Sequence, residues 1–178
     1  MMTTAITAYL ALLKDYNVHT NIYSKGAYDR LDFHVQDCQT LAGILQNKEL
    51  SILDIGSGSG LPAIILAICN PKNQVRAVES KSRKTRFLNH VKETLSLNNL
   101  EIIQANIVEY AREKVAKADI ITAKAFASLE RVELVSRPLR HEKSEIWIPI
   151  SKQQSQNLSL QKSRVFQKES FYYAHWKA

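Results

Sequence analysis

The chain contains little glycine and little cysteine, and it has no long apolar run. Five of its 178 residues are glycine and two are cysteine, Cys38 and Cys69. Two distant cysteines give little support for a disulfide or a metal site, so we expect buried free thiols and no bound metal. No stretch approaches the roughly eighteen consecutive apolar residues of a membrane span, and the start lacks the basic and apolar run of a signal peptide. These absences predict a soluble cytoplasmic protein that does not bind a membrane.

Positive charge is in excess and is unevenly spread. The formal net charge is +7, from 24 Lys and Arg against 17 Asp and Glu. Residues 1–50 carry four basic and five acidic side chains, so the excess lies in residues 51–178. A basic surface favours a polyanionic partner such as nucleic acid. A solvated, lysine-rich surface without a partner is the alternative.

Three of the five glycines lie within five residues. The segment that holds them runs Leu53-Asp54-Ile55-Gly56-Ser57-Gly58-Ser59-Gly60-Leu61-Pro62. Its pattern predicts a short strand over 51–55, a tight turn, and an amphipathic helix over 61–69. Glycine permits positive φ and lets a ligand approach the backbone, and a helix N-terminus offers unpaired N–H groups. The segment therefore predicts a ligand-binding turn after the first strand of an α/β sheet.

The glycine spacing distinguishes between nucleotide sites. A dinucleotide fingerprint needs glycine at the sixth position, where Leu61 stands, which disfavours a hydride-transferring dehydrogenase. No Gly-Lys-Ser/Thr follows, which excludes a P-loop. The pattern Asp-x-Gly-x-Gly-x-Gly resembles motif I of the class I S-adenosylmethionine-dependent methyltransferases. That resemblance implies S-adenosylmethionine as the cofactor, with the binding residues Asp54, Gly56, Ser57, Gly58, Gly60 and Leu61.

An acid follows the turn after one strand–helix–strand unit. Residues 74–79 predict a strand that ends on Glu79, and ligands of open α/β sheets bind outside the carboxyl ends of the strands. A carboxylate accepts from both hydroxyls of a ribose, so we expect Glu79 and the adjoining Ser80 in the cofactor site. After the third strand, Asn106 and Ile107 are expected beside the adenine. The alternatives are a solvated Glu79 and an Asn106 that only caps a helix.

The rest of the chain alternates between strands and helices. Two helices are expected first, over about 3–15 and 28–46. Strands are then expected at 51–55, 74–79, 101–105, 119–123 and 144–149, with helices at 61–69, 82–97, 108–117 and 127–137. A polar segment (151–163) precedes two short strands, 164–167 and 171–175, that suit an antiparallel hairpin. The pattern predicts a Rossmann-like α/β fold with a mostly parallel sheet covered on both faces. Residues 1–50 would form a helical extension packed on the domain of residues 51–178.

Four further motifs narrow the resemblance. They are Tyr16-Asn17 with Asn21-Ile22, His34 with Asp37, the run from Ser80 to Leu88, and Lys124-Ala125-Phe126-Ala127-Ser128-Leu129. In this order they resemble the bacterial ribosomal small-subunit methyltransferase G family, also called glucose-inhibited division protein B, over about residues 16–130. Members of that family methylate N7 of a guanine in 16S ribosomal RNA. The resemblance therefore implies 16S ribosomal RNA or the small ribosomal subunit as partner, and we expect a monomer.

The chain departs from the family pattern at three positions. Lys124 stands where the family has Arg, Ala63 where it has Gly, and Asn106 where it has Arg. Lysine keeps the charge but loses the planar fork of arginine. A methyltransferase of a small molecule or protein is a second hypothesis. A non-catalytic RNA-binding relative is a third, and the change at Lys124 motivates it.

Several residues are expected to act on the RNA. N7 of guanine is a free lone pair, so its methylation needs alignment and charge stabilisation rather than a base. Lys124 is the expected catalytic residue and contacts the RNA backbone or guanine O6, while Phe126 packs near the base or cofactor, or in the core. The basic residues at the start of the helix after Glu79 are expected to bind phosphates, and a solvated helix face is the alternative; they are Arg83, Lys84 and Arg86. For Arg86 an ion pair with a nearby acid is a further alternative. His34 and Asp37, three apart on one helix, are expected to form a structural pair.

Overall fold

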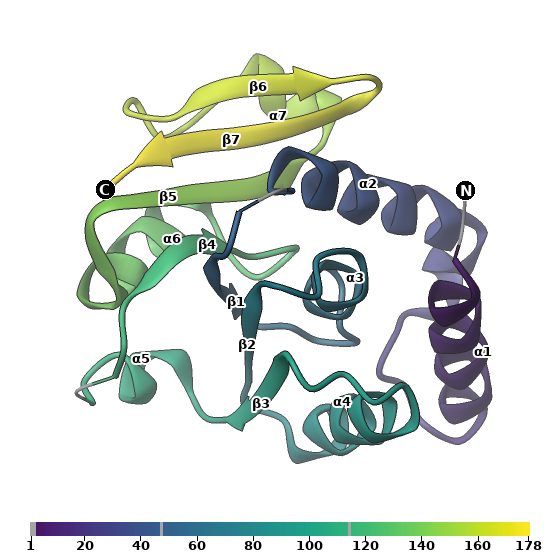
Figure 1. Cartoon of the computed structure of the whole chain (residues 1–178). Helices are drawn as coiled ribbons and strands as arrows, with labels where there is room; N and C mark the ends of the chain where they lie inside the picture. The colour runs from purple at the N-terminus through teal and green to yellow at the C-terminus, as the bar shows by residue number, and fades with distance from the viewer. Residues whose placement is uncertain (1–2, 47, 114) are drawn as a thin grey trace.

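A seven-stranded sheet forms the centre of the computed structural model, which describes residues 3–46, 48–113 and 115–178. The strand order is β3-β2-β1-β4-β5-β7-β6. The strands are β1 (Ser51–Ile55), β2 (Gln74–Glu79), β3 (Leu100–Gln104), β4 (Ala118–Thr122), β5 (Arg140–Ile150), β6 (Arg164–Lys168) and β7 (Phe171–Lys177). The first five are parallel, and β6 and β7 form an antiparallel hairpin on β5 (Figure 1). The predicted Rossmann-like fold and its closing hairpin are confirmed.

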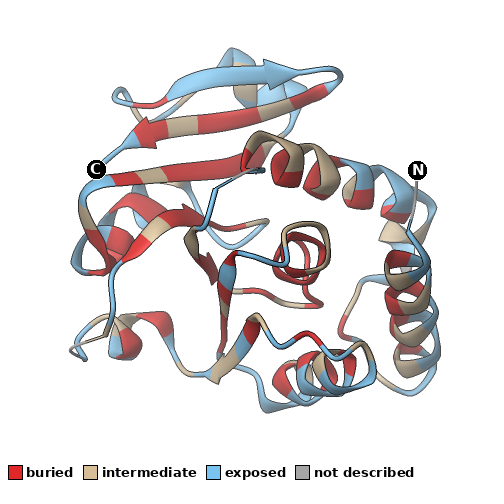
Figure 2. Ribbon diagram, viewed as in Figure 1, coloured by how far each residue is buried: buried red, intermediate tan, exposed pale blue. Residues whose placement is uncertain are grey.

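Helices cover both faces of the sheet. They are α1 (Thr4–His19), α2 (Leu31–Ile44), α3 (Ala63–Cys69), α4 (Ser82–Thr94), α5 (Ile107–Tyr110), α6 (Leu129–Ser136) and α7 (Lys152–Gln156), with 3-10 turns η1 (Lys25–Arg30) and η2 (Arg137–Leu139). Apolar side chains of the central strands point alternately to the two faces, so the strands are buried on both sides (Figure 2). One core lies under α1 to α4, and the other lies under α5 and α6.

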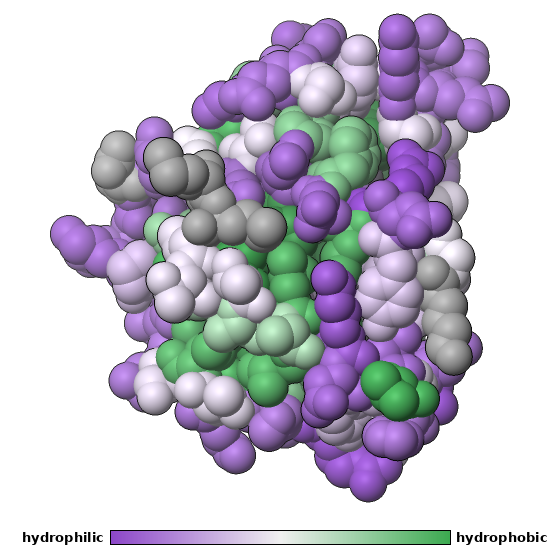
Figure 3. All heavy atoms as spheres, turned by 90° about the vertical axis from the view of Figure 1, so that its right-hand side faces the viewer, coloured by the Kyte–Doolittle hydropathy of each residue, from purple (hydrophilic) through white to green (hydrophobic). Residues whose placement is uncertain are grey.

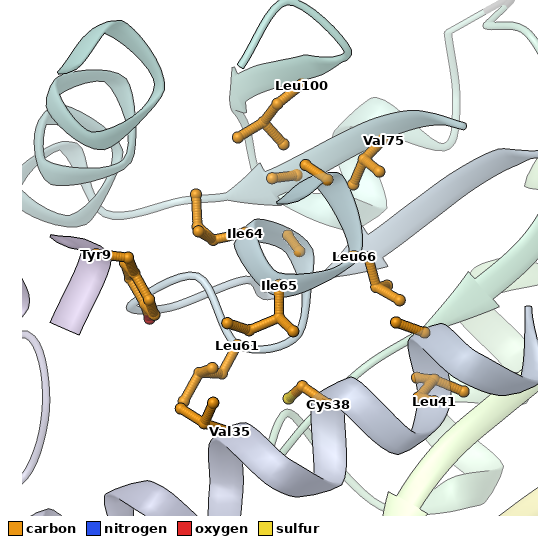
Figure 4. Close-up of a cluster of buried hydrophobic side chains, with 14 of the residues drawn as sticks. Tyr9, Val35, Cys38, Leu41, Leu61, Ile64, Ile65, Leu66, Val75 and Leu100 are labelled. Atoms are coloured by element: carbon orange, nitrogen blue, oxygen red, sulfur yellow. The ribbon is translucent and has the colours of Figure 1, made fainter. Parts of the chain in front are cut away.

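The first two helices share the core of α3. Val35, Cys38 and Leu41 of α2 and Tyr9 of α1 surround Leu61 and the apolar side chains of α3 (Figure 4). Two tyrosine hydroxyls add directional contacts: Tyr9 donates to the carbonyl of Ser59 (3.0 Å), and Tyr173 of β7 donates to the carbonyl of Asp37 (2.9 Å). These contacts fix α1 and α2 against the glycine turn and the sheet.

Two elements differ in kind from the sequence prediction, and others differ in their bounds: β5 begins at Arg140 instead of residue 144, and α1 continues to His19 instead of residue 15. The helix expected over 108–117 is only the short α5, because beyond Tyr110 the side chains of Arg112 and Glu113 are exposed and few apolar groups hold another turn on the sheet. Residue 114 of that expected helix lies outside the described residues. The polar segment 151–163 contains α7, whose first turn is closed by a capping box between Ser151 and Gln154.

The outer surface on the α1 side is mostly polar. Figure 3 shows polar side chains around a band of apolar ones on this face. Across the described part of the chain, no helix has the length and apolar character needed to cross a bilayer.

Candidate active site

The glycine turn has a backbone that only glycine adopts without strain. Gly56, Gly58 and Gly60 have φ values of 69°, 60° and 104°. A Cβ on Gly60 would lie 2.4 Å from Cγ1 of Ile64, which is buried in α3. The amides of Gly56 and Ser57 both donate to the carbonyl of Val78, at 2.9 and 3.1 Å. The turn is therefore pinned to the end of β2 and closely packed on α3.

Glu79 lies at the carboxyl end of β2 and faces this turn. Its carboxylate is buried and accepts from the backbone amides of Gly58 and Lys81, each at 2.9 Å. An ionised carboxylate has about four lone-pair sites, so acceptor capacity remains for a ligand's hydroxyls. Glu79 is therefore not the solvated surface acid of the alternative interpretation.

Asp54, at the end of β1, is a buried acid without a donor. Neither oxygen of its carboxylate has a hydrogen-bond partner among the described residues. The Ser57 hydroxyl donates to the backbone carbonyl of Asp54, at 3.2 Å. Burial raises the pKa of Asp54 to about 7, although the Ser57 hydroxyl and the Ala63 amide lie near enough to the carboxyl to lower its pKa. Buried polar groups are nearly always paired, so this carboxyl marks a place where a donor from outside the protein is expected.

The remaining predicted cofactor residues lie at the same edge of the sheet. The amide of Ala105, just after β3, donates to the carbonyl of Glu79 at 3.1 Å. Asn106 follows, and its side chain accepts from the amide of Val108 at 2.9 Å, which is the helix cap of the alternative interpretation. Ser80 is exposed and Ile107 is buried. The ends of β1, β2 and β3 thus bring Asp54, Glu79 and Asn106 to one side.

The three basic residues at the start of α4, Arg83, Lys84 and Arg86, lie in different surroundings. The Nζ of Lys84 comes within 3.7 Å of the position that a Cβ on Gly58 would take, so this ammonium lies beside the glycine turn. Arg83 donates to the carbonyl of Asn21 at 3.3 Å and connects α4 to the segment after α1. Arg86 is exposed and forms no ion pair with the described residues.

Lys124 is paired with an acid from the N-terminal helices. Its Nζ lies 2.6 Å from Oδ2 of Asp37, and the two side chains are 17% and 8% exposed. His34 and Asp37 lie on the same face of α2, where both line one cavity, but the ion pair that Asp37 forms is with Lys124. The Nδ1 of His34 has no partner in the described part of the chain. Burial, and then the charges of Lys124 and Arg30, lower the pKa of His34.

A cavity of about 770 Å³ opens beside this pair. Its walls come from α2, the loop after β4, the end of β5 with α7, and the start of β7. They include Arg30, Phe33, Asp37, Lys124, Phe126 and Tyr172. Sequence reasoning missed Arg30, Phe33 and Tyr172, which lie in no motif and are brought together only by packing.

Phe126 lies beside the glycine turn and also lines the cavity. Its Cδ2 atom lies 2.4 Å from where a Cβ on Gly56 would stand, so the ring takes the space that the glycine leaves. The residue is 36% exposed, which excludes the core-packing alternative. Ala125, just before it, has φ 52°, a strained value for alanine. The loop after β4 thus reaches both the turn and the cavity.

The parallel sheet, the glycine turn after β1 and the acid that ends β2 define a class I methyltransferase fold. Solved structures of methyltransferases have a similar fold. A putative methyltransferase, yhhF from Escherichia coli, has a TM-score of 0.61 at 14% identity, over 80% of this chain and 85% of that one. A precorrin-6y C5,15-methyltransferase from Geobacter metallireducens has a TM-score of 0.60 at 12% identity, over 89% and 92%. At these identities the likeness shows the fold alone.

The family model described as rRNA small subunit methyltransferase G matches residues 2–176, and the chain belongs to this family. Proteins of that name are 31% identical over 156 residues in Methylobacillus flagellatus, 36% over 141 in Brachyspira hyodysenteriae and 42% over 105 in Psychrobacter cryohalolentis. These alignments cover 87%, 78% and 59% of this chain. They cover 74%, 66% and 42% of the relatives, so the chain spans only part of their length.

Proposed function

We propose that this protein transfers a methyl group from S-adenosylmethionine to N7 of a guanine in 16S ribosomal RNA. The observation that carries the proposal is a glycine turn with a buried acid, Glu79, beside which Phe126 also lines a 770 Å³ cavity. The turn suits a nucleoside cofactor, and the cavity suits a substrate base. The proposed partner is the small ribosomal subunit, and we propose a monomeric cytoplasmic enzyme without a metal.

The residues at the turn fit S-adenosylmethionine. Asp54 offers a buried carboxyl without a donor, and the cofactor's ammonium group is a donor of the required kind. Glu79 retains lone pairs for the ribose hydroxyls, and the open Cα of Gly56 permits close approach once Phe126 moves. When bound, the cofactor supplies a methyl group on a positively charged sulfur.

The protein's own residues then have two tasks. N7 of guanine attacks with its lone pair, so no residue has to remove a proton first, and the site must hold the base in line. The Lys124 ammonium gives one N–H to Asp37, and its two remaining donors help to hold the base in line, with Asp37 fixing where they point. Around the site, Arg83, Lys84 and Arg86 supply phosphate contacts, which weaken as salt rises.

A methyl-transfer assay tests this function. Small subunits from cells that lack the guanine modification are incubated with the protein and cofactor carrying a labelled methyl group, and the labelled nucleotide is mapped in the RNA. We expect label on N7 of one guanine in 16S RNA, and none with subunits that already carry the modification. Label on another atom, or none on unmodified subunits, would contradict the proposal.

Replacing Phe126 by alanine is expected to speed cofactor entry. The ring occupies the space beside Gly56, so binding requires the ring to leave, and the apparent affinity is reduced by the fraction of time that the site is closed. If the ring covers Gly56 nine-tenths of the time, its removal raises the association rate of S-adenosylhomocysteine about 10-fold. Stopped-flow binding measures this rate.

The matched control is Phe33→Ala, which removes another half-exposed ring of the same cavity that does not touch Gly56. We expect it to leave the association rate unchanged. An unchanged or slower rate in Phe126→Ala would show that the ring does not obstruct the turn.

A further inference from the structure

We infer that the Lys124–Asp37 ion pair recognises the guanine base, with Lys124 donating to O6 and Asp37 accepting from the N1–H and N2 amino groups. This inference rests on the proposed function and deepens it, because it assigns a specificity role to an acid in the N-terminal helices. The juxtaposition that points to it is a buried donor–acceptor pair on the wall of the cavity.

The pair presents a donor directly beside an acceptor. Nζ of Lys124 and Oδ2 of Asp37 are 2.6 Å apart, and both residues line the cavity. The ammonium has three N–H donors and gives one to Asp37, so two remain. An ionised carboxylate has about four lone-pair sites, of which Lys124 and the nearby Tyr173 hydroxyl take at most two, so Asp37 keeps acceptor capacity. The pair can therefore donate and accept towards the cavity at once.

Guanine matches this arrangement and adenine opposes it. The Watson–Crick edge of guanine has the O6 acceptor next to the N1–H and N2 donors. Adenine has the reverse order, an N6 donor beside the N1 acceptor, so the ammonium would meet a donor and the carboxylate an acceptor. Cytosine is reversed in the same way. A site with this pair therefore selects guanine. It rejects adenine because bound adenine would leave the polar groups of the site and of the base without hydrogen-bond partners.

The surroundings favour a base over a phosphate at this point. Asp37 cancels the charge of Lys124 and repels a phosphate. The more exposed Arg30 lies at the cavity wall and forms no ion pair with an acid among the residues that the structure describes. Phe126 supplies an aromatic ring in the same cavity, and stacking of a base on an aromatic ring contributes about 1–3 kcal/mol. The Phe33 ring already lies under the Arg30 guanidinium, whose central carbon is 5.5 Å from the ring centroid. The Tyr173 hydroxyl donates a hydrogen bond to the backbone carbonyl of Asp37 and so holds α2 in place at the wall of the cavity.

Nucleotide binding tests the inference without methyl transfer. The full chain, saturated with S-adenosylhomocysteine, is titrated with guanosine, inosine and adenosine 5′-monophosphates and followed by NMR. We expect the guanine nucleotide to bind about 10-fold or more tightly than the adenine nucleotide, and more tightly than inosine, which lacks the N2 amino group. Equal binding of all three, or no binding of the guanine nucleotide, would overturn the inference.

Variants separate recognition from folding. Asp37→Ala should abolish the preference for guanine over inosine, and Lys124→Met should weaken guanine binding but keep that preference. Asp37→Asn keeps the side chain's shape and serves if the alanine variant does not fold; it should reduce the preference because its acceptor is neutral. The control Asp32→Ala removes an exposed acid of α2 that does not line the cavity, and it should change nothing.

The two proposals fail differently. Guanine-selective binding that disappears in the Asp37 variants, without methylation of small subunits, would contradict the proposed function and leave the recognition site standing. Correct methylation by an enzyme whose Asp37 variants retain the full preference for guanine over inosine would contradict the recognition site alone.

Discussion

Replacing Glu133 by glutamine is expected to lower the free energy of unfolding by about 3–5 kcal/mol, the usual cost of breaking a buried ion pair. The carboxylate of Glu133, buried on α6, accepts hydrogen bonds from both terminal nitrogens of Arg140, at 2.8 and 3.1 Å. It also accepts from Lys162 (2.6 Å) and from the indole of Trp176 (2.8 Å). Glutamine leaves the buried Arg140 without a counter-charge. The loss would loosen the attachment of β7 and of the segment before β6 to α6.

The pH dependence gives this prediction a second measurement. Burial alone would raise the pKa of Glu133, but the hydrogen bonds from Arg140, Lys162 and Trp176 outweigh it and lower the pKa from 4.5 to about 2. Because the folded pKa is depressed, the stabilisation is complete above about pH 5 and is lost as the pH falls towards 2. Between pH 7 and pH 3 this shift removes about 2 kcal/mol of stabilisation from the wild type, so the difference in unfolding free energy between wild type and variant should narrow by about that amount.

Urea denaturation at pH 7 and pH 3 measures that gap. The control Glu142→Gln removes an exposed acid of β5 two residues from Arg140, and a change within about 0.5 kcal/mol is expected for such a surface site. A gap between wild type and Glu133→Gln that stays constant from pH 7 to pH 3 would mean that the charge of Glu133 is not what stabilises the cluster.

Replacing Glu79 by glutamine is expected to weaken binding of S-adenosylhomocysteine about 10- to 100-fold, the range for losing a hydrogen bond to a charged group. The amide nitrogen of glutamine cannot accept from Gly58 or Lys81, and the charge that favours the ribose hydroxyls is gone. Isothermal titration calorimetry measures the affinity. Glu101→Gln, an exposed acid of the neighbouring β3, is the control and should bind normally.

A deoxy ligand separates the two roles of Glu79. If Glu79 binds the ribose, the penalty of the glutamine variant shrinks for 2′-deoxy-S-adenosylhomocysteine, because the hydroxyl that it would bind is missing. If Glu79 only orders the turn through Gly58, the penalty is the same for both ligands. Normal affinity of Glu79→Gln for both ligands would remove this residue from the cofactor site.

The local parts of the fold follow from the sequence. Apolar strands that alternate with amphipathic helices specified a parallel sheet buried on both faces, because that pattern has few other ways to cover its apolar surface. The glycine turn and the position of Glu79 were also local, since positive φ and the length of one strand–helix–strand unit are set over about twenty residues. The expected helix over 108–117 was wrong because few buried contacts follow Tyr110, and periodicity does not report such contacts.

The tertiary structure alone decided which distant groups meet. Asp37 and Lys124 are 87 positions apart, and Phe126 reaches Gly56 across the ends of β1 and β4. The sequence had paired Asp37 with His34, its helical neighbour, because spacing along a helix is visible in sequence and approach across a sheet is not. Charge, glycine and periodicity are properties of short segments, whereas ion pairs and cavities depend on how α2, the loop after β4 and β7 pack together.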